Sequence, residues 1–372
     1  MKKIIYILTA ATLISCTKNE VAYEPTHEIG FTAVAGNITK AVVDGTTYPT
    51  SLNMYVFAWT TDYGTKDSEV SPNYINKGEF KYKEAKNGIN VWGGVTPYYW
   101  PNTKNLHFAG CSKSGNGNII DDPNTESVEG PTFTYNCLTE ALTIENYAPG
   151  RLTGEGDNDL MWFGSTKHTK DDGYDKDTPS VPVNMYHTCS WITFIVKGET
   201  ATQSYKVTEM EMINIDQTAT VTCDPSPENS DPTIKWTGNT DKTNTSDNPT
   251  DYAITLPSGG ITIGTTGVNV ETNDATTTKN TGGNIVVIPQ VPGKLCLTYT
   301  YKSSTDATIT EKIEGDKALD LKITTDATDS NNKWEPGKHY IYTITIRANE
   351  ILIAPTPQDW VEPGSSGNIT VE

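Results

Sequence analysis

Long hydrophobic runs, excess positive charge and helical periodicity are all scarce in this chain of 372 residues. After the N-terminal stretch, no apolar segment approaches the ~20 residues that a membrane-spanning helix needs. The chain carries 28 basic and 46 acidic residues, a formal net charge of -18. This balance argues against nucleic acid or an anionic bilayer as partner, because neutralising phosphates requires Lys and Arg. We find no convincing helix longer than two turns.

Motifs for catalysis and metal binding are missing as well. The odd number and wide spacing of the cysteines after Cys16 fit neither a zinc pattern nor a disulfide framework, so most should be buried small hydrophobic residues, with one bridge left open. The histidines lack metal-ligand spacing, and no GxSxG, HExxH or phosphate-binding Gly loop occurs. The sequence therefore predicts no catalytic residue, no metal and no cofactor. A carboxylate pair on distant strands of a hydrolase stays open.

The residues that are abundant favour an all-β fold. Thr, Asn, Gly, Tyr and Pro suit many short strands joined by polar turns. The length fits two domains. We expect an N-terminal β-sandwich over 28–176, a C-terminal β-sandwich over 177–349 and a tail over 350–372. The boundary falls in Thr166–Ser180, the most loop-like stretch of the chain.

The stretch Glu28–Ala41 contains the first strand. Its apolar residues recur at every second position and predict one buried face. They are Ile29, Phe31, Ala33 and Ala35. Such a strand either opens a sandwich permanently or is detachable.

Three later stretches give clear strand signals. Leu52–Trp59 is apolar on both faces, as expected of a central strand that is covered on each side. Leu295–Tyr301 and Tyr340–Ile346 alternate strictly and predict half-buried strands. Asp62–Gly88 is turn-rich. The remaining polar stretches, 224–250 and 259–283, are predicted to be loops.

The N-terminus resembles the signal peptide of bacterial lipoproteins. Lys2 and Lys3 precede an apolar stretch, Ile4–Ile14, that is too short to span a bilayer. The sequence LISC that ends at Cys16 resembles a lipobox. The resemblance implies a signal peptide over 1–15, acylation of Cys16 with chains such as palmitate, a lipidated tether over 16–27 and attachment to the outer membrane.

Several stretches, taken in order, resemble the fimbrillin family, the subunits of type V pili. They are PYYWP with LHFAG (Pro97–Gly110), DLMWFG (Asp159–Gly164), VPVNMYHTCSWITFIV (Val181–Val196), WEPGKHYIYTITI (Trp334–Ile346) and the C-terminal segment from Ile351. The resemblance implies a non-enzymatic lipoprotein with two tandem transthyretin-like β-sandwich domains. It also implies a location at the cell surface and polymerisation with other fimbrillin subunits.

The family's assembly mechanism maps onto two segments of this sequence. Proteolysis between Lys40 and Ala41 would release the first strand, and the C-terminal tail of the next subunit would replace it. The family more commonly has Arg at the cleavage point, and an arginine-specific protease would cut Lys poorly. The expected donor residues are Ile351, Ile353, Trp360, Val361, Ile369 and Val371.

Other interpretations remain open on the sequence alone. The protein is alternatively an anchor or tip fimbrillin that does not polymerise. A second alternative is a monomeric lipoprotein that uses exposed aromatic residues to bind a glycan or another ligand on a host or bacterial surface. The aromatic candidates are Tyr98, Tyr99 and Trp100, although a buried core rim is the better interpretation. The Asp-rich loop 171–177 lacks the spacing of a calcium site and is interpreted as solvated.

Overall fold

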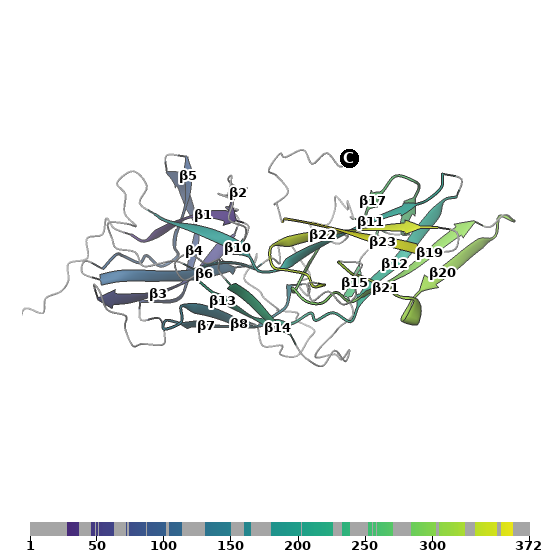
Figure 1. Cartoon of the computed structure of the whole chain (residues 1–372). Coiled ribbons are helices and arrows are strands. Elements are labelled where there is room, and N and C mark those ends of the chain that lie inside the picture. Colours follow the sequence, from purple (N-terminus) through teal and green to yellow (C-terminus); the bar gives the residue numbers. More distant parts are fainter. Residues whose placement is uncertain are drawn as a thin grey trace, which may run out of the picture.

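The computed structural model describes the chain in segments between residues 28 and 359. These are 28–36, 46–48, 50, 52–62, 72, 74–86, 88–101, 104–113, 131–149, 160–164, 180–201, 203–225, 233–238, 252–254, 256–257, 259–270, 284–302, 305–323, 332–347 and 351–359. Within them the fold is all-β, and η2 (Gly315–Lys317) is a single 3-10 turn. Figure 1 shows two lobes end to end, an N-terminal lobe in purple to teal and a C-terminal lobe in teal to yellow.

The larger sheet of the N-terminal lobe closes on itself. Its strands are β1 (Gly30–Gly36), β2 (Thr46–Thr47), β3 (Asn53–Asp62), β4 (Ile75–Lys86), β5 (Ile89–Gly94), β6 (Lys104–Lys113), β9 (Met161–Gly164) and β10 (Val181–His187). They run in the order β10-β9-β6-β3-β4-β5-β1-β2, and β1 also pairs with β10, which completes a ring. β1 and β10 are parallel, whereas the other pairs around the ring are antiparallel.

β3 shows how the sequence pattern builds this lobe. Met54, Val56 and Ala58 belong to the cluster of buried side chains inside the ring. Phe57 and Trp59 belong to a second cluster on the outside of the ring. The prediction that this strand is covered on both faces is confirmed, and it explains why the strand has no polar side.

A smaller sheet covers the outside of the ring. Its strands are β7 (Thr132–Asn136), β8 (Ala141–Tyr147), β13 (Ala219–Asp224) and β14 (Thr233–Gly238), in the order β14-β13-β8-β7. The second cluster, which we call the outer cluster, lies between this sheet and the ring. It includes four cysteines: Cys111, Cys137, Cys189 and Cys223. The expectation that most of the cysteines are buried is confirmed.

Strand pairing crosses the boundary that the sequence placed between residues 176 and 177. β10 follows that point yet pairs with β1 and β9. β13 also follows it, and pairs with β8 of the N-terminal lobe. Chain beyond residue 177 therefore supplies one strand of the ring and half of the sheet that covers it.

Three regions that were predicted to lack strands contain them, and one of these, 259–283, holds the short strands Ile261–Ile263 and Val268–Asn269. β4 lies within the turn-rich stretch Asp62–Gly88, and β14 lies within the Thr- and Asn-rich stretch after Asp224. β4 carries Lys, Glu and Asn on its outward side, which hides its buried positions Ile75 and Phe80 from a periodicity search. The three expectations were wrong, because pairing in the sheet overrides weak local patterns.

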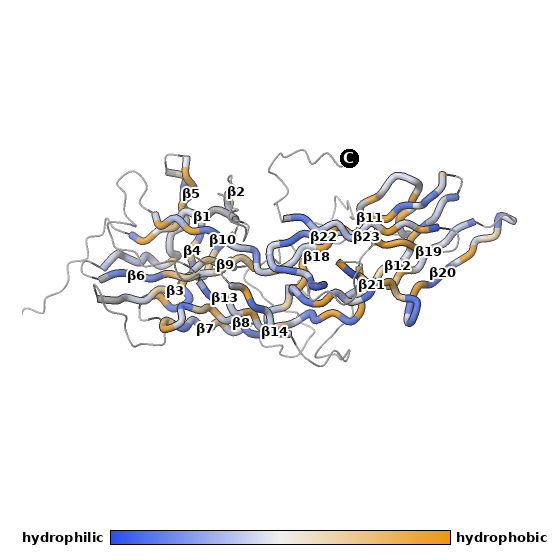
Figure 2. Tube along the Cα trace, viewed as in Figure 1, coloured by the Kyte–Doolittle hydropathy of each residue, from blue (hydrophilic) through white to orange (hydrophobic). Residues whose placement is uncertain are grey.

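The C-terminal lobe is a sandwich of two sheets. One sheet contains β11 (Ser190–Gly198), β17 (Val268–Asn269), β18 (Asn284–Val287), β22 (Lys338–Ile346) and β23 (Ile351–Asp359). The other contains β12 (Tyr205–Ile213), β15 (Tyr252–Ile254), β16 (Ile261–Ile263), β19 (Lys294–Lys302), β20 (Thr308–Ile313) and β21 (Leu319–Asp320). Polar and apolar residues alternate along these strands in Figure 2.

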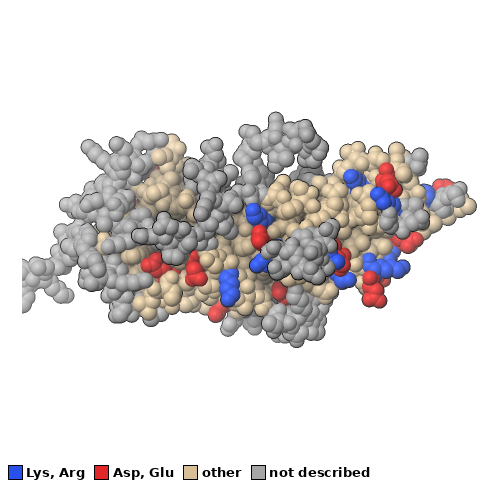
Figure 3. Space-filling model, in the orientation of Figure 1, with Lys and Arg blue, Asp and Glu red and all other residues tan. Residues whose placement is uncertain are grey.

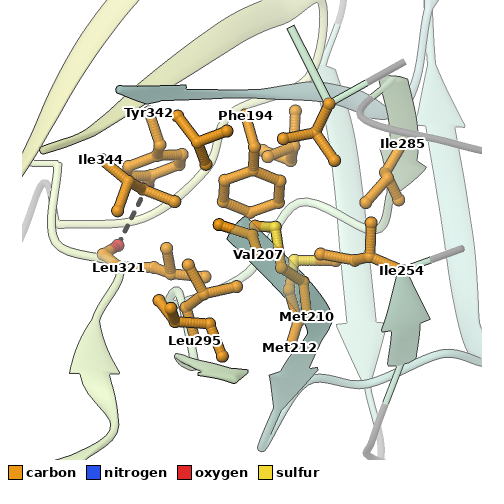
Figure 4. Close-up of a cluster of buried hydrophobic side chains, with 14 of the residues drawn as sticks. Phe194, Val207, Met210, Met212, Ile254, Ile285, Leu295, Leu321, Tyr342 and Ile344 are labelled. Atoms are coloured by element: carbon orange, nitrogen blue, oxygen red, sulfur yellow. Dashed lines mark hydrogen bonds between the residues drawn. The ribbon is translucent and has the colours of Figure 1, made fainter. Parts of the chain in front are cut away.

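Side chains from both sheets meet in the core of this lobe. Figure 4 shows Phe194 and Tyr342 of one sheet facing Val207 and Met210 of the other. The Tyr342 hydroxyl donates a hydrogen bond to the Leu321 carbonyl at 3.0 Å. The alternation predicted for the strands that became β19 and β22 is confirmed, since their inward apolar positions are buried, apart from Tyr301 at the end of β19, which is half-buried.

The stretch that begins at Trp334 turns the chain into β22. The Trp334 indole is fully buried and donates to the Tyr342 hydroxyl at 3.0 Å. Gly337 has a φ of 68°, a left-handed conformation that favours glycine. Its N–H donates to the Cys189 carbonyl at 2.9 Å, so this turn also fixes the start of β11.

The first of the chain's passages between the lobes is the short connection between β10 and β11. The hydroxyl of Thr188 donates to the Leu160 carbonyl at 2.7 Å, and the Trp236 indole donates to the Thr188 carbonyl at 2.6 Å. Leu160 directly precedes β9 and Trp236 belongs to β14, and both strands are part of the N-terminal lobe. The bond from Gly337 secures the next residue, Cys189, from the other side. The connection is thus held by hydrogen bonds from both lobes.

Candidate functional site: the first strand and the tail

The predicted buried face of the first strand is present. Ile29, Phe31 and Ala33 are 0%, 0% and 1% exposed and line the inside of the ring. The side chain of Ala35 lies outside the described part of the structure. The period-two pattern of Glu28–Ala41 therefore identified the inward face of β1 correctly at these three positions.

Phe31 occupies an aromatic pocket at the centre of the ring. Its ring centroid lies 5.1 Å from that of Phe80, 5.2 Å from that of Phe108 and 5.7 Å from that of Phe163. The first two contacts are edge-to-face, a favourable geometry for aromatic pairs. Those three rings come from β4, β6 and β9, so β1 supplies the residue around which three other strands pack.

The backbone of β1 is paired along both edges. Six residue pairs join it to β10, from Phe31 with Val181 to Gly36 with Tyr186. The opposite edge pairs with β5 at Gly30 and Phe31 and with β2 at Val34 and Ala35. Loss of β1 would therefore unpair both neighbours at once and open the interior of the ring.

Side chains and main chain also fasten the start of this strand. The Ile29 N–H donates to the Tyr98 carbonyl at 2.8 Å. Lys83 forms an ion pair with Glu28, and the hydroxyls of Thr32 and Ser180 share a hydrogen bond. The ion pair is solvent-exposed and contributes little, whereas the backbone bond is part of the strand register.

Several predicted site residues lie outside the described residues. They are Cys16, Lys40, Ala41, Trp360, Val361, Ile369 and Val371, together with the Asp-rich loop 171–177. Their roles stay predictions. Lys40 lies in the segment 37–45, between the end of β1 at Gly36 and the start of β2 at Thr46.

The first part of the predicted donor tail forms β23 within its own C-terminal lobe. β23 pairs antiparallel with β22 over nine residue pairs, from Ile346 with Ile351 to Lys338 with Asp359. Ile351 and Ile353 are half-buried and pack against the core of the lobe. β23 ends the order of its sheet in the described part of the chain.

Two prolines determine which edge of β23 can form hydrogen bonds. Pro355 and Pro357 pair with Tyr342 and Tyr340 inside an uninterrupted ladder. Proline has no N–H, so the ladder stays continuous only if both ring nitrogens face away from β22. The outer edge of β23 therefore lacks two of the donors that an added strand would need.

A polar cluster fastens the far end of β23, and sequence analysis missed it. His339 of β22 accepts a hydrogen bond at Nδ1 from the Gln358 amide at 2.7 Å, and its Nε2 lies 2.8 Å from the Thr193 hydroxyl. The imidazole stacks on Trp191 with centroids 3.7 Å apart and an interplanar angle of 5°. His339 lies just before the alternating stretch Tyr340–Ile346, so that pattern gave no information on whether this residue is buried.

Burial determines the protonation of this histidine. His339 is 6% exposed. Desolvation lowers the pKa of the imidazole to about 4, because the charged ring loses its hydration. At neutral pH the ring is therefore neutral, with Nδ1 available as an acceptor for Gln358 and Nε2–H as a donor to Thr193.

The aromatic stretch considered as a glycan platform is part of the ring's packing. Trp100 is 4% exposed and contacts Phe108 edge-to-face at 5.7 Å. Tyr98 is half-buried and stacks on Phe80 at 5.9 Å. Tyr99 forms a bridge with Glu28 next to β1. The interpretation as a core rim is supported.

Burial lowers the reactivity of the cysteine thiols in the outer cluster. Burial raises the pKa of the Cys111 thiol to about 12 and also raises that of Cys223. Thiolates are the nucleophilic form, so these cysteines act as packing residues. His107 stacks on Trp59 at 4.5 Å, and His187 is 2% exposed. Among the described residues, no group of three or more His, Cys, Asp or Glu could hold a metal ion.

Charges of both signs share the described surface. Figure 3 shows basic and acidic side chains interspersed on the face drawn there. Ion pairs such as Arg347 with Glu199, at 2.9 Å, and Lys294 with Asp320, at 3.4 Å, match this mixed surface. In the part of the chain that the structure describes, no helix has the length and hydrophobicity to cross a bilayer.

Comparison with known proteins identifies the family. A family model described as fimbrillin-like matches residues 39–360. A fimbrial protein from Bacteroides vulgatus has 15% identity and a TM-score of 0.54, with 90% of this chain and 99% of that one covered. At this identity the likeness shows the fold alone. No curated protein matches the sequence.

Two other fimbrial structures resemble the chain more distantly. The tip fimbrial protein Mfa3 from Porphyromonas gingivalis, with a C-terminal truncation, has 11% identity and a TM-score of 0.32, with 90% and 99% coverage. A fimbrial assembly protein from Parabacteroides distasonis has 12% identity and a TM-score of 0.32, with 89% and 98% coverage. The family is identified by the family model, which spans most of the sequence. The chain belongs to the fimbrillin-like family.

Proposed function

We propose that the protein is a polymerising fimbrial subunit that exchanges β-strands with its neighbours. It is exported as a lipoprotein acylated at Cys16 and tethered to the outer membrane. Cleavage between Lys40 and Ala41 then releases β1, and the tail of another subunit takes its place. Its role is structural, and its partners are other fimbrillin subunits at the cell surface.

The observation that carries this proposal is the place of β1 in the ring. The strand fills the interior with Ile29 and Phe31 and pairs along both edges. Its covalent link to the rest of the lobe runs through segment 37–45, which contains Lys40. A single cut after Lys40 would therefore leave β1 held by non-covalent contacts alone.

The gap left by β1 specifies what a replacement strand must provide. It needs apolar side chains at every second residue to fill the positions of Ile29 and Phe31. It also needs main-chain groups that pair with both β10 and β5. Ile369 and Val371 in the tail have this period-two spacing, and Trp360 is the aromatic residue of the tail.

The proposal includes two tandem transthyretin-like domains as the bodies that the exchanged strands connect. The closed ring with its covering sheet corresponds to the first and the two-sheet sandwich to the second. Support comes from the two separate arrangements of sheets. The donor tail follows the second body directly, so one subunit carries an acceptor in one lobe and a donor attached to the other.

The test is the N-terminal residue of protein isolated from the bacterial surface, determined by mass spectrometry. We expect a mature chain that starts at Ala41 and runs as a ladder on unheated gels. Lys40→Ala should remain uncut and monomeric. Lys40→Arg should be processed at least as fast as wild type, and faster if the protease prefers arginine.

A lipidated chain that starts at Cys16 and runs as a monomer would overturn the polymerising role. An anchor fimbrillin would then be the better account. Processing of Lys40→Ala at the wild-type rate would move the cleavage site elsewhere and remove the role assigned to Lys40.

A further inference from the structure

The C-terminal tail has two competing positions if it acts as a donor. In the structure its first nine residues form β23 in the chain's own C-terminal lobe. A strand that is paired in its own subunit must be at least partly released before a neighbour can use it. The contacts that hold β23 therefore determine how readily residues 351–359, which include the donor candidates Ile351 and Ile353, become available.

The two ends of β23 are held differently. Ile351 and Ile353 at its start pack against the core. From Ala354 onward, Pro355 is half-buried and Pro357 is exposed, and neither belongs to the residues that pack against the core as Ile351 and Ile353 do. The ladder with β22 continues to Asp359, and at this far end the side-chain bond from Gln358 to His339 adds to it.

His339 is itself held rigidly. Its second ring nitrogen is bonded to Thr193, and its face stacks on Trp191. Trp191 packs in turn against the outer cluster of the N-terminal lobe. The acceptor offered to Gln358 is thus fixed by β11 and, through Trp191, by contacts that reach the other lobe.

We propose that His339 is a positioning residue that latches the far end of β23 through Gln358 and so restrains release of the tail to another subunit. The inference rests on the proposed function for its consequence in assembly. The latch itself concerns the uncleaved subunit and can be measured without any assembly.

Hydrogen exchange of the full-length, uncleaved chain tests the latch. Gln358→Met keeps the length of the side chain and removes the amide donor. His339→Phe keeps a ring on Trp191 and removes both ring-nitrogen bonds. We expect amides of residues 351–359 to exchange about fivefold faster in Gln358→Met, the equivalent of one ordinary hydrogen bond, and faster still in His339→Phe.

The matched control is Thr356→Ala, an exposed position on the same strand and the same face as Gln358. It should leave exchange in 351–359 within about twofold of wild type, because surface changes away from specific contacts have small effects. Amides of β1 and β10 should keep the wild-type rate in all three variants. If Gln358→Met and Thr356→Ala exchange alike, the latch is refuted.

Assembly of the processed protein separates this inference from the proposed function. A chain that ends at residue 350 should not polymerise, and Gln358→Met should polymerise faster than wild type. If the truncated chain still polymerises, the donor role of the tail fails, whatever the exchange data show. If truncation blocks assembly but Gln358→Met assembles at the wild-type rate, the proposed function stands and the restraint by His339 fails.

Discussion

The first and last described strands of this protein differ in how the fold uses them. β1 places its large apolar residue Phe31 between small or polar ones, whereas β23 begins with an apolar run, Ile351–Pro355. β1 is paired along both edges and closes a ring, with its inward side chains at 0–1% exposure. β23 is paired with β22 alone in the described sheet, and most of its residues alternate between half-buried and exposed.

This difference determines what each strand's removal would do. Without β1, the closed sheet opens, and the pocket formed by Phe80, Phe108 and Phe163 loses the Phe31 side chain that it encloses. Without β23, the C-terminal sandwich keeps both sheets and loses one edge. A subunit that gives away its last strand and receives a replacement for its first strand therefore keeps its donor lobe folded, while its acceptor lobe depends on the exchange.

The sharpest test of this comparison truncates equivalent side chains in the two strands. We expect Ile29→Ala to lower the free energy of unfolding by about 2–5 kcal/mol and Phe31→Ala by about 3–5 kcal/mol, as for fully buried residues. Ile353→Ala should cost about half as much as Ile29→Ala, because that side chain is half-buried at a sheet edge. Denaturant titration of the uncleaved chain measures all three.

Leu352→Ala serves as the control for that series, because Leu352 is 40% exposed on β23. It should change stability by no more than about 0.5 kcal/mol. Equal losses from Ile29→Ala and Ile353→Ala would show that the two strands contribute equally and would break the comparison.

Acid should loosen β23 before it loosens β1. The pKa of His339 is lowered from 6.5 to about 4 in the folded protein. The neutral ring therefore contributes stability that is fully present above pH 6.5 and is lost progressively as the pH falls to about 4. We expect a loss of roughly 1–2 kcal/mol.

His339→Phe isolates this contribution from that of the carboxylates that titrate in the same range. The difference in stability between wild type and His339→Phe should shrink from pH 7 to pH 4. Hydrogen exchange should locate the change in residues 351–359. A constant difference over that range would mean that the imidazole does not titrate as its burial implies.

Opening the outer edge of β23 should have the smallest effect on stability. Replacing Pro355 and Pro357 with Thr restores two N–H donors on that edge, which we expect to change the free energy of unfolding by about 0.5 kcal/mol or less. Self-association should nevertheless rise, because an exposed edge with its donors intact pairs with other strands. Analytical ultracentrifugation of the uncleaved chain measures this.

Thr356→Val is the matched control for the proline variant, because it raises the β-propensity of the same strand without adding an N–H. That variant should stay as monomeric as wild type. If the double proline variant also remains monomeric, the prolines do not protect this edge.

The sequence by itself determined the fold class and the buried faces of the strongest strands. Two-sided hydrophobicity in Leu52–Trp59 and strict alternation in Tyr340–Ile346 are local signals, since each residue's own polarity reports which face it occupies. The same signal identified the inward residues of β1. It failed for β4, where long polar side chains on the outward face conceal the few buried positions, and for β14, whose short alternation of half-buried and exposed residues lies within a polar stretch.

The tertiary structure alone decided the partners of each strand. Nothing in Val181–His187 indicates that it pairs in parallel with β1, and nothing in Ala219–Asp224 indicates that it covers the ring of the other lobe. The latch at His339 likewise depends on three strands meeting. The alternation of residues specifies which face of a strand is buried. It does not specify which strand pairs along each edge, because backbone hydrogen bonds are the same for all residue types, so the partner follows from the path of the whole chain.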